Sequence, residues 1–145
     1  MGYGEADMGC DIHIVLERRK KTGGDWIGVY LTDELPGGRP LIAQRDYSFF
    51  GRIAGVRRQT ADTIYPKNLP EDISDLAWQA YMTAPRDHHS ASHMPAIQFV
   101  NAWIAENPQG PDSKIRPEWA TYHLLGAHCD EEGGFEYRIV FWFDN

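Results

Sequence analysis

The chain's clearest pattern is an alternation of apolar and polar positions over residues 9–17. A β-strand turns successive side chains to opposite faces, so this alternation predicts a strand with one buried face. The apolar positions are Cys10, Ile12, Ile14 and Leu16; the other positions are Asp11, His13, Val15 and Glu17. Asp11 and His13 thus share the polar face, about 6.5–7 Å apart at the usual strand rise. They form either an ordinary solvated face or a pair that can share a metal, a phosphate or a proton.

Two further strands follow from the apolar pattern. Residues 18–25 have the composition of a charged hairpin turn, and residues 26–31 then predict a strand antiparallel to the first. Residues 137–145 are aromatic and β-branched at consecutive positions. Such a run predicts a central strand that is buried on both faces.

Apolar residues at helical spacing predict three helices. The first spans 46–58 with Asp46 as its N-cap, and the second spans 71–82. The third spans 94–106, with Ser92 as its N-cap. We therefore expect an α+β fold: a mainly antiparallel sheet holding the first, second and C-terminal strands, with about three helices packed on it.

Length and composition fit one globular domain. The chain has 145 residues, 42% of them apolar, and five are tryptophan. We expect the domain to span 8–145, with residues 1–7 a disordered extension or Met8 an alternative start. The first residues lack a signal-peptide pattern, and no apolar run reaches the length of a membrane span. We therefore expect no membrane association and a cytoplasmic location.

Charge and cysteine content limit the kinds of partner and the cellular compartment to be expected. The formal net charge is −7, which argues against binding to bulk nucleic acid because that needs a basic surface. A small nucleotide-like ligand held by a few local arginines remains compatible with it. The two cysteines, Cys10 and Cys129, show no spacing that demands a disulfide, so we expect a reducing compartment.

A second polar stretch contains three of the six histidines. It spans residues 87–93 and reads Asp-His-His-Ser-Ala-Ser-His, which we interpret as a loop leading into the third helix. Dense histidine beside aspartate is a common composition for metal ligands. The stretch lacks the fixed spacing of a zinc finger or of an HExxH helix. The alternative is an exposed polar loop.

An anion site is expected where the first helix begins. Arg45 precedes this helix and Tyr47 lies in its first turn. Backbone N–H groups at a helix N-terminus favour anions, and an adjacent arginine strengthens that preference. Arg57 could add further positive charge.

Five blocks of the chain, taken together, resemble a family of small bacteriophage and prophage proteins whose sequences begin MGCDIH. The blocks are residues 8–13, 45–57, 69–74, 87–93 and 138–145, in the family's order. The family's loop reads DGHSxSW, so His88 stands where the family has glycine and His93 where it has tryptophan. The resemblance thus favours His89, with Asp87 beside it. It implies a phage protein acting in the bacterial host cell and a shared polar site, without supplying a reaction.

These residues lead to a first functional hypothesis: a hydrolase of a phosphodiester or nucleotide that uses a divalent metal such as zinc, manganese or nickel. The expected metal ligands are Asp11, His13, Asp87 and His89. The expected catalytic groups are His13, His89 and Asp11. The expected substrate-binding residues are Arg45, Tyr47, Arg57, Ser90 and Ser92.

Two other functions fit the same residues. The first is a binding module that sequesters a host nucleotide signal or a host protein, with tryptophans as stacking surfaces. The second is a structural, virion-associated protein, which would expose a broad apolar surface.

Overall fold

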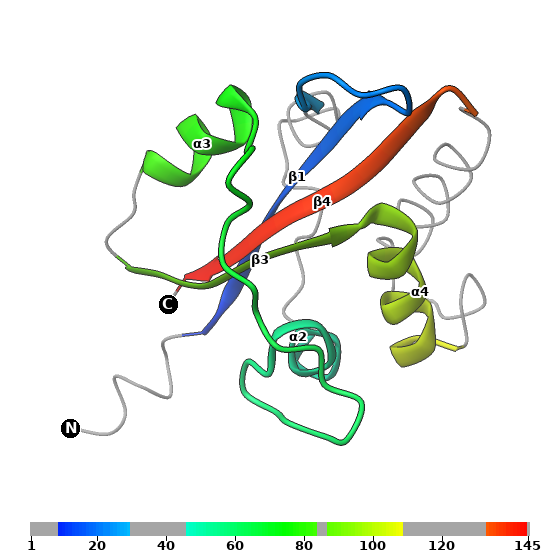
Figure 1. The fold of residues 1–145 in the computed structure, drawn as a ribbon. Helices are drawn as coiled ribbons and strands as arrows, with labels where there is room; N and C mark the ends of the chain where they lie inside the picture. Colours follow the sequence, from blue (N-terminus) through cyan, green and yellow to red (C-terminus); the bar gives the residue numbers. More distant parts are fainter. Residues whose placement is uncertain (1–8, 30–45, 84–86, 109–132, 145) are drawn as a thin grey trace, which may run out of the picture.

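Four antiparallel strands form the sheet, in the spatial order β2-β1-β4-β3 (Figure 1). The computed structural model describes residues 9–29, 46–83, 87–108 and 133–144. The strands are β1 (Asp11–Lys20), β2 (Ile27–Val29), β3 (His88–Pro95) and β4 (Phe135–Asp144). With the helices below, they confirm the predicted single α+β domain and its antiparallel sheet.

The two longest strands, β1 and β4, pair along their whole length. Asp11 stands opposite Asp144 at one end, and Lys20 stands opposite Phe135 at the other. The C-terminal strand therefore lies in the middle of the sheet, between β1 and β3, as its apolar run predicts. This pairing joins the two ends of the chain and fixes which side chains share a face.

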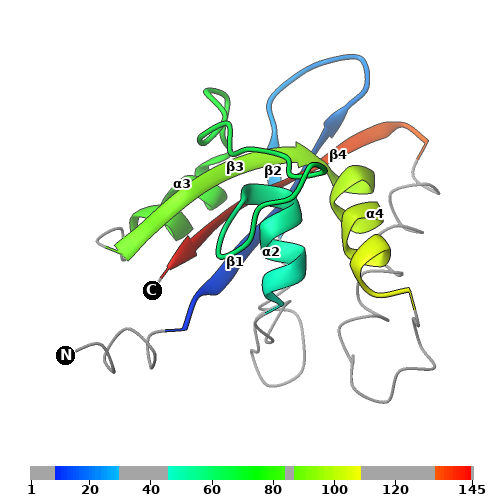
Figure 2. The ribbon, with the colours of Figure 1, turned by 90° about the horizontal axis from the view of Figure 1, so that it is seen from below.

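One face of the sheet carries the larger part of the core. Directly opposed residues point to the same side, so Ile12 and Ile14 of β1 lie with Phe143 and Phe141 of β4. Helices α2 (Tyr47–Ala54) and α4 (Ala96–Glu106) both cover this face (Figure 2). Aromatic side chains fill the space between these helices and the sheet, including Phe49, Phe50, Phe99 and Trp103.

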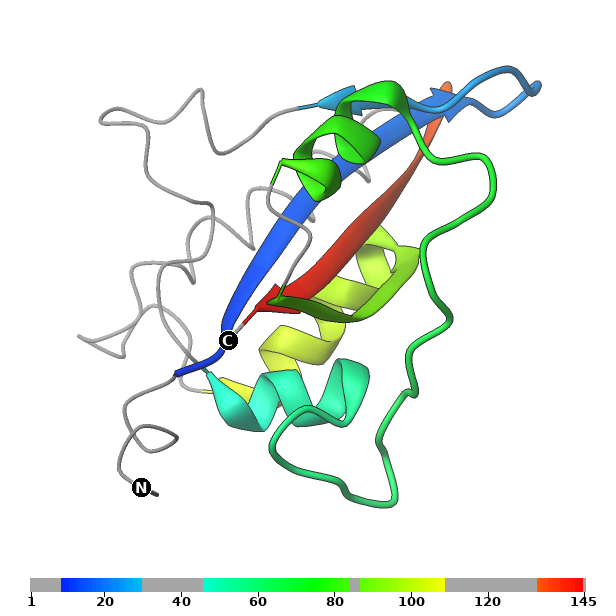
Figure 3. The ribbon, with the colours of Figure 1, turned by 90° about the vertical axis from the view of Figure 1, so that its left-hand side faces the viewer.

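Helix α3 (Asp75–Met82) covers the opposite face (Figure 3). Its Ala77 packs with Val15, Val140 and Trp142 in a second, smaller core. The alternation in the sequence predicts that Val15 and Glu17 are on a polar face, and for these two positions the prediction is wrong. Both are buried, because α3 and the segment before it lie over this part of β1.

Capping residues set the ends of the first two helices. Asp46 accepts a hydrogen bond from the N–H of Phe49, as the sequence predicts. The helix ends at Ala54, short of the predicted residue 58, because Gly55 adopts a left-handed conformation (φ 68°). Helix α3 begins at Asp75, after the predicted start at 71, because Ser74 caps it.

The stretch at residues 87–93 is mostly strand, so the predicted loop is wrong. Ser92 does not cap the following helix: it is buried, and its hydroxyl accepts a hydrogen bond from the Lys67 N–H at 3.1 Å. Helix α4 follows Pro95 with no side-chain cap. Between His89 and Ser92 the pairing with β4 is interrupted by an irregularity, which breaks any period-two pattern in the sequence.

A buried ion pair links β1, β4 and the start of α3. Glu17 is fully buried, and its carboxylate accepts a hydrogen bond from Nε of Arg138 at 2.5 Å. The other carboxylate oxygen accepts the backbone N–H of Ser74 at 2.7 Å. Nη1 of Arg138 donates to the side chain of Asp72 at 2.8 Å. These bonds hold the N-cap of α3 against the two central strands.

We expect Glu17→Ala to lower the free energy of unfolding by about 3–5 kcal/mol, because it removes the buried carboxylate that accepts from both Arg138 and the Ser74 N–H and leaves those donors buried. Urea unfolding of the purified protein measures this change. Glu136→Ala is the matched control: it breaks a half-exposed pair with Arg19, for which about 0–1 kcal/mol is expected. Equal losses in the two variants would contradict the importance of the buried pair.

Candidate metal centre

Three chain segments meet at one end of the sheet: the start of β1, the start of β3 and the end of β4 (Figure 1). Asp144 of β4 stands opposite Asp11 on one side and opposite His88 on the other. His13 stands opposite Trp142, one step along the same face. The face covered by α3 therefore gathers polar side chains at this end.

His13, His88 and Asp144 form a group that could hold a metal ion. Each offers one ligand atom, and these atoms all lie within 4.8 Å of one another. All three side chains are half-buried, and Nε2 of His13 pairs with Oδ2 of Asp144. The three residues come from three different strands, so the sheet register holds them together.

Aromatic rings form the floor and one wall of this group. The His13 ring stacks on Trp142, with centroids 5.8 Å apart and planes 13° apart. The His88 ring lies 5.6 Å from Trp142 and 4.9 Å from Tyr81 of α3. These contacts limit the rotation of both imidazoles, most of all that of His88, which packs against two rings, and this favours a preformed site.

The surroundings of His88 favour its neutral form. Burial lowers the pKa of His88, and the nearby His13 lowers it further, while Asp144 and the backbone of Tyr81 oppose the shift. Its Nδ1 is buried and has no hydrogen-bond partner within the described residues. A neutral imidazole is the form that binds a metal, so this ring needs little or no deprotonation before it can act as a ligand.

Two imidazoles and one carboxylate are a common ligand set for a transition metal. Zinc accepts histidine nitrogen and aspartate oxygen, nickel suits imidazole, and iron(II) enzymes use two histidines with one carboxylate. Three protein ligands leave coordination positions for water or substrate. Among the described residues, this set of three ligands is therefore closer to that of a catalytic zinc site than to the four ligands of a closed structural site.

The predicted ligands are only partly brought together. His13 belongs to the group, and Asp11 and Asp87 are exposed residues at the same end of the sheet. His89 lies on the opposite face: its ring stacks on Phe143 at 6.1 Å, and its Nε2 is 3.9 Å from Sγ of Cys10. His88 and His89 are neighbours in a strand, so they point to opposite faces, and His88 is the one that reaches His13.

The predicted substrate-binding residues do not gather beside this group. Tyr47 accepts a hydrogen bond from the Cys10 N–H at 3.2 Å, and the Arg57 guanidinium lies 5.1 Å from the Tyr47 ring centroid. Both lie on the α2 side of the sheet. The Ser90 hydroxyl is 3.0 Å from Nδ1 of His89, and the hydroxyl of Ser92 is bonded within the fold. Arg45 lies outside the described residues.

Two members of the group, His88 and Asp144, were absent from the predicted ligand set. The signal for Asp144 was available: antiparallel pairing of the first and last strands sets the start of one beside the end of the other. The signal for His88 required residues 88–95 to be recognised as a strand. Once they are, alternation assigns His88 and His89 to different faces.

Comparisons with known proteins assign no family: no family model, no curated protein and no solved structure matches the chain. Within the described residues, no helix is long and apolar enough to cross a membrane. The likeness to MGCDIH phage proteins stays a prediction.

We expect the metal-free protein to lose stability in acid partly through His88. Its folded-state pKa lies below the ordinary 6.5, so below that pH the unfolded chain takes up a proton first. The contribution of His88 to the free energy of unfolding is therefore fully present above about pH 6.5 and is lost as the pH falls through the folded-state pKa. His88→Gln should reduce this loss in urea unfolding with a chelator present, whereas His93→Gln should keep it. An identical pH dependence in wild type and His88→Gln would contradict the shift.

We expect the protein to bind one zinc ion per chain through His13, His88 and Asp144. His88→Ala and Asp144→Asn should each weaken binding by more than about 100-fold, the upper range for changes that only touch outer-shell groups. Isothermal titration calorimetry measures the affinity. His89→Ala is the matched control, because this ring lies on the other face, and it should bind like wild type. Loss of binding in His89→Ala alone would instead favour the ligand set predicted from the sequence.

Proposed function

We propose that this protein is a metal-dependent hydrolase and that its ion is held by His13, His88 and Asp144. The observation that carries the proposal is the convergence of these three ligand atoms within 4.8 Å. A divalent ion held this way would lower the pKa of a bound water and supply a nucleophile near neutral pH.

Within the proposal, Asp11 is the general base. It stands directly opposite Asp144 in the β1–β4 register and therefore points to the same face. Opposed Cβ atoms lie about 4.5–5.5 Å apart, which allows its carboxylate to reach a water bound beside Asp144. The Asp11 side chain is exposed, so a proton it accepts can pass to solvent.

The proposed substrate is a phosphodiester or a nucleotide. Arg57 lies on the opposite face at the same end of the sheet, over the ring of Tyr47. The Tyr47 hydroxyl accepts a hydrogen bond from the N–H of Cys10, the residue that precedes β1. A substrate that extends round the end of the sheet would meet this guanidinium after leaving the metal group. Arginine favours phosphate oxygens, which is why this class is preferred over neutral substrates.

A second candidate is a binding module that sequesters a nucleotide or a host protein, in keeping with the phage resemblance. The observation that favours it is an exposed aromatic surface next to His88. Trp78 is 47% exposed and stacks with Tyr81, whose ring contacts His88. Exposed rings of this kind can stack on a nucleobase without any turnover.

We expect the zinc- or manganese-loaded protein to hydrolyse bis(p-nitrophenyl) phosphate, followed by its absorbance. His88→Ala and Asp144→Asn should abolish turnover through loss of the ion. Asp11→Asn should lower kcat by about 10²–10⁴-fold while the metal stays bound, which is the usual contribution of a general base. His89→Ala should retain activity.

Two outcomes would contradict the hydrolase. One is activity that persists in His88→Ala after dialysis against a chelator. The other is a nucleotide that forms a tight complex with the loaded protein and is recovered intact, which would favour the binding module.

A further inference from the structure

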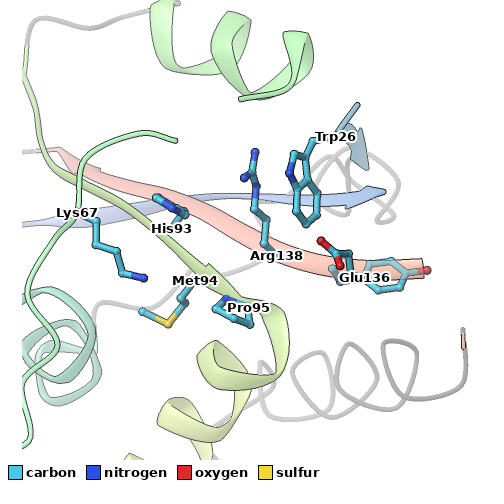
Figure 4. Close-up of a pocket in the computed structure, with 8 residues that line it drawn as sticks. Trp26, Lys67, His93, Met94, Pro95, Glu136 and Arg138 are labelled. Carbon is cyan, nitrogen blue, oxygen red and sulfur yellow. The ribbon is translucent and has the colours of Figure 1, made fainter. Parts of the chain in front are cut away.

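A groove of about 330 Å³ opens on the same face of the sheet as the metal group, at the opposite end of β3 and β4 (Figure 4). Lys67 and His93 lie at one end of the groove, and Trp26, Glu136 and Arg138 lie at the other. Pockets that bind small molecules measure about 300–1,000 Å³, so this groove suits a small ligand.

The aromatic end of the groove is held in place. The Trp26 indole N–H donates to Asp72 at 3.1 Å. The guanidinium carbons of Arg138 and Arg19 lie 4.0 Å and 4.6 Å from the ring centroid. Because Arg138 is also tied to Glu17 and Asp72, the indole forms a preorganised wall.

The other end is held by the segment that runs beside β3. The Asn68 N–H donates to the Ala91 carbonyl at 2.9 Å, and the Lys67 N–H donates to the Ser92 hydroxyl at 3.1 Å. Nδ1 of His93 lies 3.2 Å from the Asn68 carbonyl, which can only accept, so Nδ1 carries a proton. These bonds fix the backbone from which the Lys67 side chain extends.

Within the part of the chain that the structure describes, the charges around the groove leave one cation uncompensated. Arg138 pairs with Glu17 and Asp72, and Arg19 pairs with Glu136. The Lys67 ammonium has no ion-pair partner among residues 9–29, 46–83, 87–108 and 133–144. In a chain of net charge −7, this end of the groove therefore attracts an anion locally.

We propose that this groove is a second binding site, for a small organic anion. Its carboxylate or phosphate group binds the Lys67 ammonium, and its apolar body lies along Pro95 towards Trp26. The volume favours a ligand of about one ring over a peptide or an oligonucleotide. This inference does not depend on the proposed hydrolase.

The test is a titration of ¹⁵N-labelled protein with four related probes, observed by NMR in the presence of a chelator. Benzoate and phenyl phosphate carry the anion, benzamide is neutral, and benzylamine is cationic. We expect benzoate and phenyl phosphate to shift the Trp26 indole resonance and the Lys67 and His93 amides saturably. Comparison of the two anions shows which charged group the site prefers.

Lys67→Gln should weaken the binding of both anions by about tenfold or more, since it removes a charge-assisted hydrogen bond. It should leave the affinity for benzamide unchanged. Lys21→Gln, which changes an exposed lysine in the β1–β2 turn, is the matched control and should bind like wild type. Three results would overturn the proposal: no saturable shift at Trp26 and Lys67, benzylamine binding as tightly as benzoate, or unchanged anion affinity in Lys67→Gln.

Discussion

The buried ion pair between Glu17 and Arg138 is the interaction on which the other features depend. A buried carboxylate is tolerated only where its oxygens are satisfied, and here Arg138 and the Ser74 N–H satisfy both. This requirement fixes β1 against β4 and sets the start of α3. A slip of one residue in that register would turn His13 to the other face of the sheet. The register that pairs Glu17 with Arg138 is thus the same register that sets His13 opposite Trp142, beside Asp144.

The two faces of β4 carry different kinds of side chain. On the α2 and α4 side, Ile139, Phe141 and Phe143 are apolar and fully buried. On the α3 side, the middle of the strand is apolar, at Val140 and Trp142, while Arg138 and Asp144 stand near its ends. The candidate metal centre and the groove lie at these two ends. Both candidate sites therefore share one face, and the opposite face supplies most of the hydrophobic stabilisation.

Sequence patterns predicted those strands and helix ends that depend on nearby residues alone. The first and last strands follow from apolar alternation and from a β-branched, aromatic run, and the Asp46 cap follows from its side chain. Strand β3 could not be predicted this way, because its sequence HHSASHMP carries little apolar pattern and becomes a strand through pairing with β4. The composition of residues 87–93 suggested a histidine ligand there, and the structure places one of these histidines, His88, in a group that could hold a metal ion. The choice between His88 and His89 depends on strand parity, which only the tertiary pairing supplies.

The most direct measurement is a crystal structure of the zinc-loaded protein with anomalous diffraction recorded on both sides of the zinc absorption edge. We expect one zinc peak per chain, bounded by the two imidazoles of His13 and His88 and the carboxylate of Asp144. Metal–nitrogen and metal–oxygen distances of about 2.0–2.2 Å would identify them as direct ligands. A peak bounded by His89 on the α2 side of the sheet, or no peak at the end of β4 in zinc-saturated crystals, would contradict the assignment of this centre.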